Sequence, residues 1–177
     1  MKPNKWQLFD ESTDLLFPWY THEFLNELRH WDISEWKIFE YGGGMSSLWW
    51  RKKAKECITI DTSAEWSSRN NLVFINKKED FINYPMEVCK NTNELFDCII
   101  IDSEPTEWRD SCTLTAISCL KKGGILIIDN WMQNSVSGCG EKSWPESQQI
   151  LKDYKKTEKI YKQSNHKDWK TGVWIKH

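Results

Sequence analysis

The sequence predicts an α/β fold with one mostly parallel sheet, because short apolar runs alternate with helical patterns along the chain. Leu95–Ile101 and Ile125–Ile128 are almost continuously apolar, as buried central strands of parallel sheets are. Three glycines, Gly42–Gly44, separate an expected strand from an expected helix. With 177 residues, of which 39% are hydrophobic, the chain is long enough for one domain with its own core. We therefore expect residues 1–177 to form a single domain.

The glycine turn belongs to a β-α-β unit. Ile38 and Phe39 are expected in a buried strand, Ser46–Lys55 in a helix, and Cys57–Ile60 in a second strand that ends at Asp61. Glycine lacks a Cβ and tolerates positive φ, so such a turn lets a ligand approach the bare backbone. Open α/β sheets bind nucleotides at this kind of corner.

The remaining pattern continues the alternation, with a helical cap expected within residues 1–34 and an aromatic patch at Leu15–Tyr20 that we interpret as packing rather than a lid. In Lys121–Gly124, two lysines are followed by two glycines, a pattern that predicts the carboxyl end of a helix. The other expected elements are helices over Thr21–Trp31, over Ala64–Asn70 and around Leu114, Ile117 and Leu120; strands over Leu72–Ile75, Lys159–Gln163 and Trp169–Lys176; a loop over Lys77–Phe81; and a polar turn over Asn91–Glu94.

Composition disfavours several classes of protein. A formal net charge of −2 provides no general attraction for nucleic acid or anionic membranes. The amino-terminal residues hold no apolar run of the ~7–15 residues that a signal peptide needs, and no segment reaches the ~20 that span a bilayer. Six cysteines without a Cys-x-x-Cys pair indicate reduced thiols rather than a disulfide framework or a zinc site. We expect a cytoplasmic protein with neither nucleic-acid nor membrane partners.

The spacing of the glycines limits which class of nucleotide ligand the turn can bind. A dinucleotide fingerprint needs a third glycine where this chain has Ser47, and no Gly-Lys-Ser/Thr of a phosphate loop follows. Glu40 before a Gly-x-Gly turn, with Asp61 after the next strand, resembles motif I and the following acidic position of class I S-adenosylmethionine (SAM)-dependent methyltransferases. Phe96–Asp102, a helix and Leu120–Asn130 resemble the fourth and fifth strands of small O-methyltransferases in that family.

The resemblance implies a Rossmann-like sheet of seven strands in the order 3-2-1-4-5-7-6, with helices on both faces. SAM is the implied cofactor, with the glycine turn under its amino-acid part and Asp61 on the ribose hydroxyls. The cofactor-binding residues that it implies are Glu40, Tyr41, Gly42, Gly43, Gly44, Ser46, Asp61, Thr62, Asp80 and Asp102.

A Mg²⁺ site is a second implication. Asp102, Asp129 and Asn130 stand where catechol-type O-methyltransferases bind Mg²⁺, and their oxygens suit that ion. The catalytic lysine of that subfamily is replaced by Pro105. A group with Tyr/Trp-Gly-x-Gly-x-Ser-Thr in motif I and an Asp…Arg pair resembles Tyr41–Ser47 and Asp102…Arg109 more closely. We therefore favour a metal-independent site, with Asp102 and Asp129 as the catalytic candidates.

The resemblance implies O-methylation of a small-molecule or sugar hydroxyl. N-methylation is the alternative, although the Asn/Asp-Pro-Pro-Tyr segment typical of it is absent at Asp102–Pro105. A SAM-binding subunit without turnover is a third hypothesis.

Two further features concern the mouth of the site. The polar loop Trp131–Trp144 is long enough to be a functional lid. His166 could act as a base if the fold brings it to the crevice. The tryptophans that either line the crevice or pack in the core are Trp66, Trp108, Trp131 and Trp144.

Overall fold

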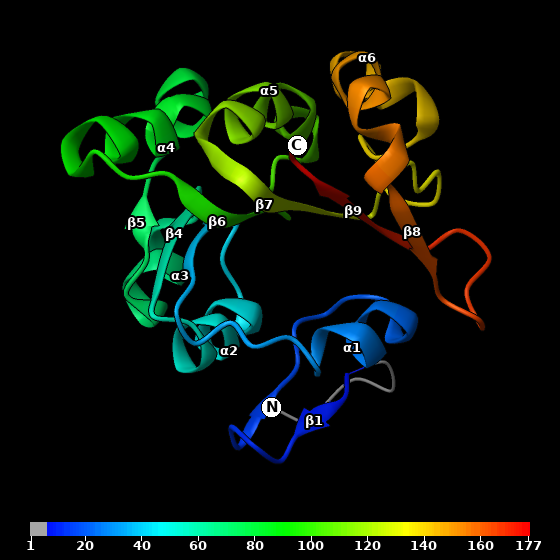
Figure 1. The fold of residues 1–177 in the computed structure, drawn as a ribbon, viewed down its shortest axis with the longest axis horizontal. Coiled ribbons are helices and arrows are strands. Elements are labelled where there is room, and N and C mark those ends of the chain that lie inside the picture. Colours follow the sequence, from blue (N-terminus) through cyan, green and yellow to red (C-terminus); the bar gives the residue numbers. More distant parts are fainter. Residues whose placement is uncertain (1–6) are drawn as a thin grey trace.

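A computed structural model describes residues 7–177 and shows a seven-stranded sheet in the order β5-β4-β3-β6-β7-β9-β8 (Figure 1). Its strands are β3 (Lys37–Tyr41), β4 (Glu56–Asp61), β5 (Val73–Phe74), β6 (Phe96–Ile101), β7 (Leu120–Asp129), β8 (Lys159–Lys162) and β9 (Lys170–Ile175). The first five are parallel to one another, and β9 runs antiparallel to both β7 and β8. Numbered along the sheet-forming strands, this is the predicted order 3-2-1-4-5-7-6, which is confirmed.

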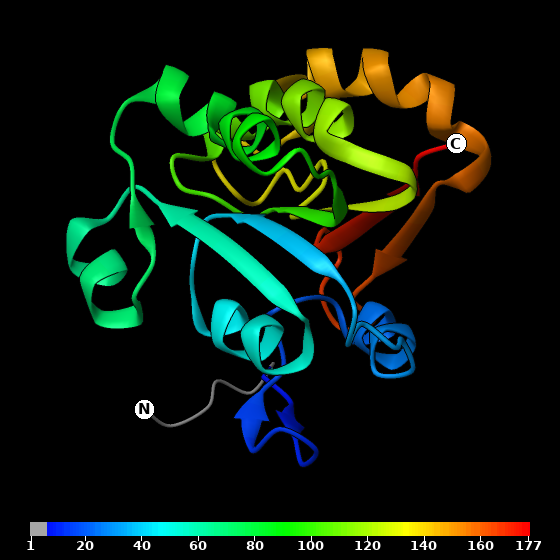
Figure 2. The same ribbon diagram turned by 60° about the vertical axis from the view of Figure 1, so that its left-hand side comes forward.

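Helices cover both faces of the sheet. They are α1 (His22–Leu28), α2 (Met45–Lys53), α3 (Ala64–Asn70), α4 (Lys78–Thr92), α5 (Arg109–Cys119) and α6 (Pro145–Leu151), with short 3₁₀ turns at Thr106–Trp108, Glu141–Ser143 and Lys152–Thr157. Figures 1 and 2 show α4, α5 and α6 on one face and α1 and α2 on the other. No helix in residues 7–177 is long and apolar enough to cross a membrane.

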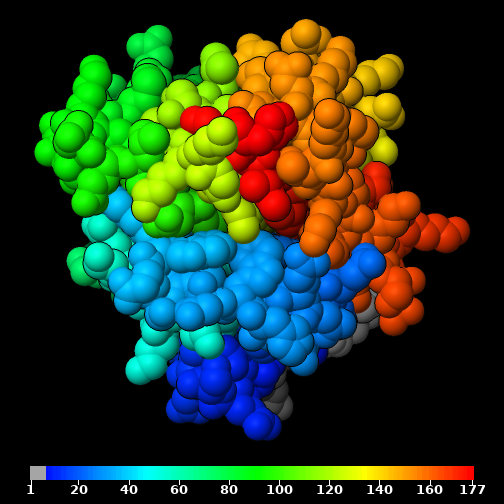
Figure 3. Space-filling view, in the orientation of Figure 1, coloured from blue at the N-terminus to red at the C-terminus, as the bar shows by residue number. Residues whose placement is uncertain are grey.

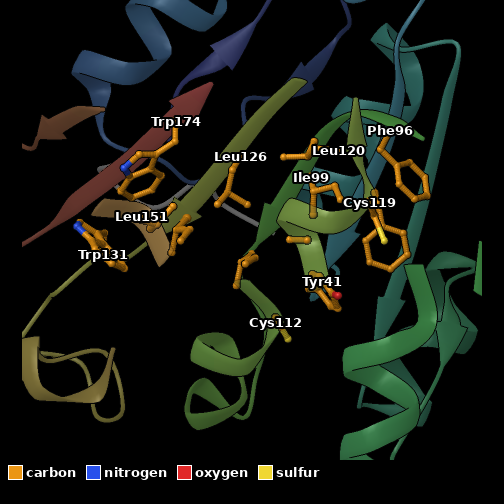
Figure 4. Close-up of a cluster of buried hydrophobic side chains, with 14 of the residues drawn as sticks. Tyr41, Phe96, Ile99, Cys112, Cys119, Leu120, Leu126, Trp131, Leu151 and Trp174 are labelled. Atoms are coloured by element: carbon orange, nitrogen blue, oxygen red, sulfur yellow. The ribbon is translucent and has the colours of Figure 1, made fainter. Parts of the chain in front are cut away.

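Each face of the sheet has its own apolar core because successive strand residues point to opposite sides. In β6, Ile99 and Ile101 pack under α4 and α5, while Cys98 and Ile100 pack on the side of α1 and α2. Figure 4 shows the first of these cores, with Ile99 beside residues of β7 and α5. Burying one such side chain stabilises the fold by about 1.5–3 kcal/mol. The continuous apolar runs in the sequence reflect this burial on both faces.

Helix α4 was not predicted. The expected loop Lys77–Phe81 and the expected turn Asn91–Glu94 are the two ends of this helix instead. Proline normally interrupts a helical pattern, and Pro85 lies inside α4. Only Phe81 and Pro85 are fully buried in it, so its apolar stripe is too short to recognise in the sequence.

The expected helix end at Lys121–Gly124 is wrong, because these residues belong to β7. Helix α5 already ends at Cys119. The cation at its carboxyl end comes from far along the chain: Lys176 Nζ donates hydrogen bonds to the carbonyl oxygens of Ile117 (2.8 Å) and Leu120 (2.7 Å). Lys176, directly after β9, therefore provides the positive charge at the carboxyl end of α5 that the local lysines were predicted to provide.

The amino-terminal region is less helical than expected. Within the described part of residues 1–34, a two-stranded hairpin of β1 (Phe9–Asp10) and β2 (Leu15–Leu16) precedes α1. The hairpin is attached to the domain through Asp10, whose carboxylate accepts a hydrogen bond of 2.7 Å from Trp49 Nε1. Figure 3 shows this region, in blue, adjoining the orange carboxyl-terminal part on one surface. There, Glu27 of α1 accepts hydrogen bonds from β8.

Candidate active site

Four strand ends meet at one edge of the sheet. The glycine turn follows β3, Asp61 ends β4, Asp102 follows β6 and Asp129 ends β7. The strands are parallel and in register there, with Tyr41 opposite both Ile60 and Ile101. This is the edge at which open α/β sheets bind their ligands.

Gly42 and Gly43 are required by packing within the protein. Gly42 has a φ of +86°, and a Cβ on it would lie 2.4 Å from the carbonyl oxygen of Asp102 and from the Cα of Ser103. A Cβ on Gly43 would lie 2.1 Å from the Leu72 Cδ1 atom. A side chain at either position would therefore collide with the protein itself, and the contact of these two residues with a cofactor stays a prediction.

Gly44 is the exception. Its backbone is extended, with a φ of −166°, and a Cβ there would find no atom nearer than the Ser46 hydroxyl oxygen at 3.7 Å. Gly44 also lies directly before the first turn of α2, whose free N–H groups favour negative charge. Of the three glycines of the turn, Gly44 is the one at which an added side chain would meet no close atom.

Glu40 lies beneath the turn and is completely buried. Its carboxylate accepts hydrogen bonds from the hydroxyls of Ser46 (2.7 Å), Ser47 (2.5 Å) and Thr59 (3.0 Å). Burial raises the pKa of Glu40 to about 7, although these hydroxyls oppose the change. Glu40 and Ser46 were predicted to contact the cofactor, but the structure directs both side chains to each other, which fixes the start of α2.

Two more predicted contacts have other partners. Tyr41 is buried in the core, where its hydroxyl donates a hydrogen bond of 2.7 Å to the Ile82 carbonyl oxygen, so only its backbone faces the edge. The Thr62 hydroxyl donates a hydrogen bond of 2.8 Å to the Glu104 carbonyl oxygen. Asp80 is exposed in the first turn of α4 rather than in a loop.

Asp61 is placed as the prediction requires. Its Oδ2 accepts a hydrogen bond of 2.8 Å from the Gly43 N–H, and its Oδ1 accepts one of 2.7 Å from the Ser63 N–H. The side chain is half-buried, and each carboxylate oxygen can accept a second hydrogen bond. Asp61 can therefore hold the turn and still bind a pair of ligand hydroxyls.

A cavity of about 380 Å³ opens at the same edge, over the ends of β6 and β7. Its lining combines carboxylates, one guanidinium, amides and aromatic rings: Trp19, Asp102, Glu104, Arg109, Asp129, Asn130, Gln133, Val136, His166 and Trp169. The rings of Trp19 and Trp169 meet edge to face, with centroids 6.3 Å apart. Such a cavity fits a small polar molecule with a flat or ring-shaped face.

The tryptophans at this cavity are not those that the sequence suggested. Trp131 and Trp144 are buried together in the core, with ring centroids 5.0 Å apart. Trp108 packs against Phe81, and the Trp66 indole donates a hydrogen bond of 2.8 Å to the Gly43 carbonyl oxygen. Of the predicted lid Trp131–Trp144, Gln133 and Val136 line the cavity.

The two cavity tryptophans come from opposite ends of the chain. Trp19 lies in the aromatic patch that we interpreted as packing, and its position in the cavity wall was missed. The sequence does not indicate this position. Only the structure shows that the side chain of Trp19 is 49% exposed. Trp169 was assigned to a strand, but it lies just before β9.

His166 reaches the cavity, as its predicted role requires, but its geometry suits a different function. The Nδ1 atom accepts a hydrogen bond of 3.1 Å from the Trp169 backbone N–H. In the neutral ring the proton then lies on Nε2. His166 can donate a hydrogen bond to a bound molecule, whereas its lone pair is not available to act as a base.

Asp129 is nearly inaccessible, with an exposed fraction of 4%. Its Oδ1 accepts hydrogen bonds from the Thr171 hydroxyl (2.9 Å) and from Trp169 Nε1 (3.4 Å). Burial, and then the nearby charge of Asp102, raise the pKa of Asp129 to about 8. Burial thus disfavours the charged carboxylate of Asp129, and its small exposed fraction leaves little of it open to a bound molecule.

Asp102 is the more accessible carboxylate, because 28% of its side chain is exposed. Burial raises its pKa, while the adjacent Arg109 opposes that change. Arg109 Nη2 donates a hydrogen bond of 3.1 Å to Asp102 Oδ1, which leaves Oδ2 without a bond to Arg109. Asp102 therefore keeps one carboxylate oxygen that Arg109 does not bond, on a side chain that lines the cavity.

The three predicted metal ligands surround Arg109. Its Nη1 donates to Asn130 Oδ1 and to the Asp129 carbonyl oxygen, both at 3.1 Å, and its Nη2 donates to Asp102. Asp129 turns its carboxylate to Thr171 instead. The residues therefore do not fit a divalent ion, because the guanidinium already bonds to one oxygen each of Asp102 and Asn130 and the Asp129 carboxylate bonds to Thr171. Within residues 7–177, no other group of His, Cys, Asp and Glu side chains is arranged to hold a metal.

No protein-family model and no curated protein matches the sequence, but solved structures match the fold. An O-methyltransferase from Bacillus cereus in complex with SAH (S-adenosylhomocysteine) has a TM-score of 0.61 and 19% identity, over 87% of this chain and 80% of that one. The MycE methyltransferase of the mycinamycin biosynthetic pathway, with Mg and SAH, has a TM-score of 0.59 and 13% identity over 89% of this chain. The N-methyltransferase NodS from Bradyrhizobium japonicum has a TM-score of 0.52 and 14% identity, over 87% and 94% of the two chains.

These likenesses show that the chain has the fold of class I SAM-dependent methyltransferases. The chain spans 48% of MycE, so it corresponds to about half of that protein. The predicted fold class is confirmed.

The raised pKa values of Glu40 and Asp129 predict how stability depends on pH. Both groups bind protons in the folded state that they release in the unfolded state, over the range from the ordinary carboxylate pKa to about 7 and about 8. Their contribution is complete below about pH 4 and is lost as pH rises to about 8. We expect the free energy of unfolding to fall as the pH rises from 5 to 8, because the folded state must release protons that the unfolded state has already lost. Urea titrations of Glu40→Gln should show a flatter pH dependence than wild type, and equal slopes would contradict the assignment.

Proposed function

We propose that this protein is a SAM-dependent methyltransferase that transfers a methyl group to a hydroxyl of a small molecule or sugar, without a metal ion. The observation that carries the proposal is the continuity of one sheet edge. Gly44, where an added Cβ would meet no close atom, and the half-buried carboxylate of Asp61 follow strands of the same sheet edge as the cavity that Asp102 lines. Relatives in fold were crystallised with SAH, which supports the same cofactor here.

Residues of β3, β4 and α4 would hold the cofactor. The backbone at Gly44 receives the amino-acid part, and the Asp61 carboxylate receives the ribose hydroxyls. Asp80, which is exposed in the first turn of α4, is the candidate for the adenine amino group. Bound SAM would supply a methyl group activated by a sulfonium cation.

One contact must adapt when the cofactor binds. The exposed bond from Thr62 to the Glu104 carbonyl oxygen connects the loops after β4 and β6. Such a hydrogen bond contributes only about 0.5–1.5 kcal/mol. A cofactor bound at micromolar affinity gains about 8 kcal/mol, so it can open this connection at small cost.

The cavity residues would bind and activate the acceptor. The Trp19 and Trp169 rings provide an apolar surface for a sugar or planar ring, and His166 Nε2 can donate to an oxygen of the acceptor. Asp102 would accept the proton of the attacking hydroxyl, and the cavity walls would orient the acceptor toward the activated methyl group that bound SAM supplies.

N-methylation is the second candidate because of the charge of the cavity. The carboxylates of Asp102 and Glu104 line the cavity together with one guanidinium, so the cavity also suits a protonated amine. An acceptor screen separates the two. Wild-type protein with SAM is incubated with panels of sugars, phenols and amines, and release of S-adenosylhomocysteine is measured. Turnover confined to amines would contradict the hydroxyl assignment, and no SAM binding in calorimetry would contradict the proposal as a whole.

Asp61 provides a direct test of cofactor binding. Asp61→Ala should weaken SAM binding by about 1.5–3 kcal/mol, because hydrogen bonds to a charged acceptor are lost. Isothermal titration calorimetry measures this change. Thr62→Val is the matched control: its hydroxyl already bonds to Glu104, so this variant should bind SAM at least as tightly as wild type. Equal affinity of wild type and folded Asp61→Ala would remove the ribose assignment.

A further inference from the structure

We infer that the Arg109 guanidinium is a built-in cation that occupies the position of a divalent metal at this sheet edge and holds Asp102 in place. Arg109 is the first residue of α5, and its side chain is only 3% exposed. Arg109 would occupy this position whichever methyl acceptor the protein binds.

The contacts of Arg109 are those of a cation site. Its Nε donates a hydrogen bond of 2.7 Å to the Ser103 carbonyl oxygen. Its two terminal nitrogens donate at 3.1 Å to Asp102 Oδ1, to Asn130 Oδ1 and to the Asp129 carbonyl oxygen. Side-chain and backbone oxygens from the loops after β6 and β7 thus surround one delocalised positive charge. Carboxylate, amide and carbonyl oxygens are also the ligands of Mg²⁺ and Ca²⁺.

The guanidinium is well suited to remain there. It is charged at every physiological pH, and its planar group of donors fits several fixed acceptors at once. Its neighbours would lose their hydrogen bonds if it left, which is costly for buried oxygens. A divalent ion would also have to approach a buried positive charge. These oxygens are therefore not available to a metal in the wild-type protein.

Arg109 is accordingly a positioning residue. By bonding to one oxygen of Asp102, it fixes the direction of that carboxylate while the side chain remains open to the cavity. It also connects the loops after β6 and β7, which both contribute walls to the cavity.

Metal binding tests the inference without reference to activity. Mn²⁺ titrations followed by electron paramagnetic resonance should show no saturable site in wild type. Arg109→Ala removes the cation and leaves the oxygens, so this variant should gain one Mn²⁺ site with a dissociation constant on the order of 10⁻⁴–10⁻³ M, as in weak oxygen-ligand sites. Asp102→Asn added to Arg109→Ala should abolish that gain. The control Arg51→Ala removes a guanidinium that bonds to the Asn70 and Asn71 carbonyl oxygens, and it should gain no site.

Three results would overturn the inference. They are a stoichiometric Mn²⁺ site in wild type that Asp102→Asn removes, a folded Arg109→Ala that binds no Mn²⁺, and an equal gain in Arg51→Ala. If Arg109→Ala does not fold, Arg109→Met fills part of the volume without charge and is tested in the same way, together with the wild-type titration. Failure of the methyltransferase proposal is distinguishable, because it appears as absent SAM binding and leaves the Mn²⁺ titrations unchanged.

Discussion

Asp102→Asn is expected to reduce kcat by about 10²–10⁴-fold, the usual range for loss of a general base. The amide keeps the shape of the side chain and one oxygen that can accept the Arg109 hydrogen bond, but it cannot take a proton from the acceptor. KM and SAM affinity should change little, since the cofactor contacts lie at Gly44 and Asp61. The measurement is steady-state release of S-adenosylhomocysteine with the best acceptor from the screen.

Two controls define this experiment. Glu104→Gln changes another carboxylate of the same cavity and should retain most of the activity, because Glu104 does not face Arg109 in the way Asp102 does. Wild-type turnover should also persist in excess chelator. Activity that disappears with chelator and returns with Mg²⁺ would show that a metal activates the acceptor, and full activity in Asp102→Asn would remove its role as the base.

Gly42→Ala is expected to destabilise the protein by about 2–5 kcal/mol, the second large effect. The left-handed φ of Gly42 costs an L-residue about 1–2 kcal/mol, and overpacking typically adds about 1–3 kcal/mol. The added Cβ would meet backbone atoms of Asp102 and Ser103, which cannot rotate away as a side chain can. Urea denaturation measures the loss of stability.

Two other glycines separate the causes. Gly123 has a similar φ of +80° with no atom within 4 Å of an added Cβ, so Gly123→Ala should show the backbone cost alone. Gly44→Ala, with an extended backbone and open space, should retain wild-type stability but bind SAM more weakly. If Gly42→Ala and Gly123→Ala were equally stable, the close approach of β3 and β6 would not matter. If Gly44→Ala bound SAM as wild type does, the ligand space over that residue would be misplaced.

The sequence pattern determined the alternation of strands and helices, and the resemblance that it carries implied the order of the sheet. Strands β6 and β7 are buried on both faces, so their apolar runs are continuous and their acidic ends are clear. The glycine turn and Asp61 are defined by a local strand-turn-helix pattern that needs no distant residue. These features depend on residues that are close together in the chain, so a sequence pattern can predict them.

Only the tertiary structure decided which side chains line the cavity and which cation forms hydrogen bonds with Asp102 and Asn130. Trp19, Arg109 and Trp169 come from three distant segments and meet only because β6, β7 and β9 are adjacent in the sheet. Glu40 fits the cofactor motif, yet its burial against three hydroxyls makes it part of the support of the turn. Asp129 follows its strand as Asp102 does, but Thr171 of the antiparallel strand takes its carboxylate. Contacts between distant segments decide where each side chain points. The spacing of residues along the chain does not show those contacts, so it does not show the side-chain directions.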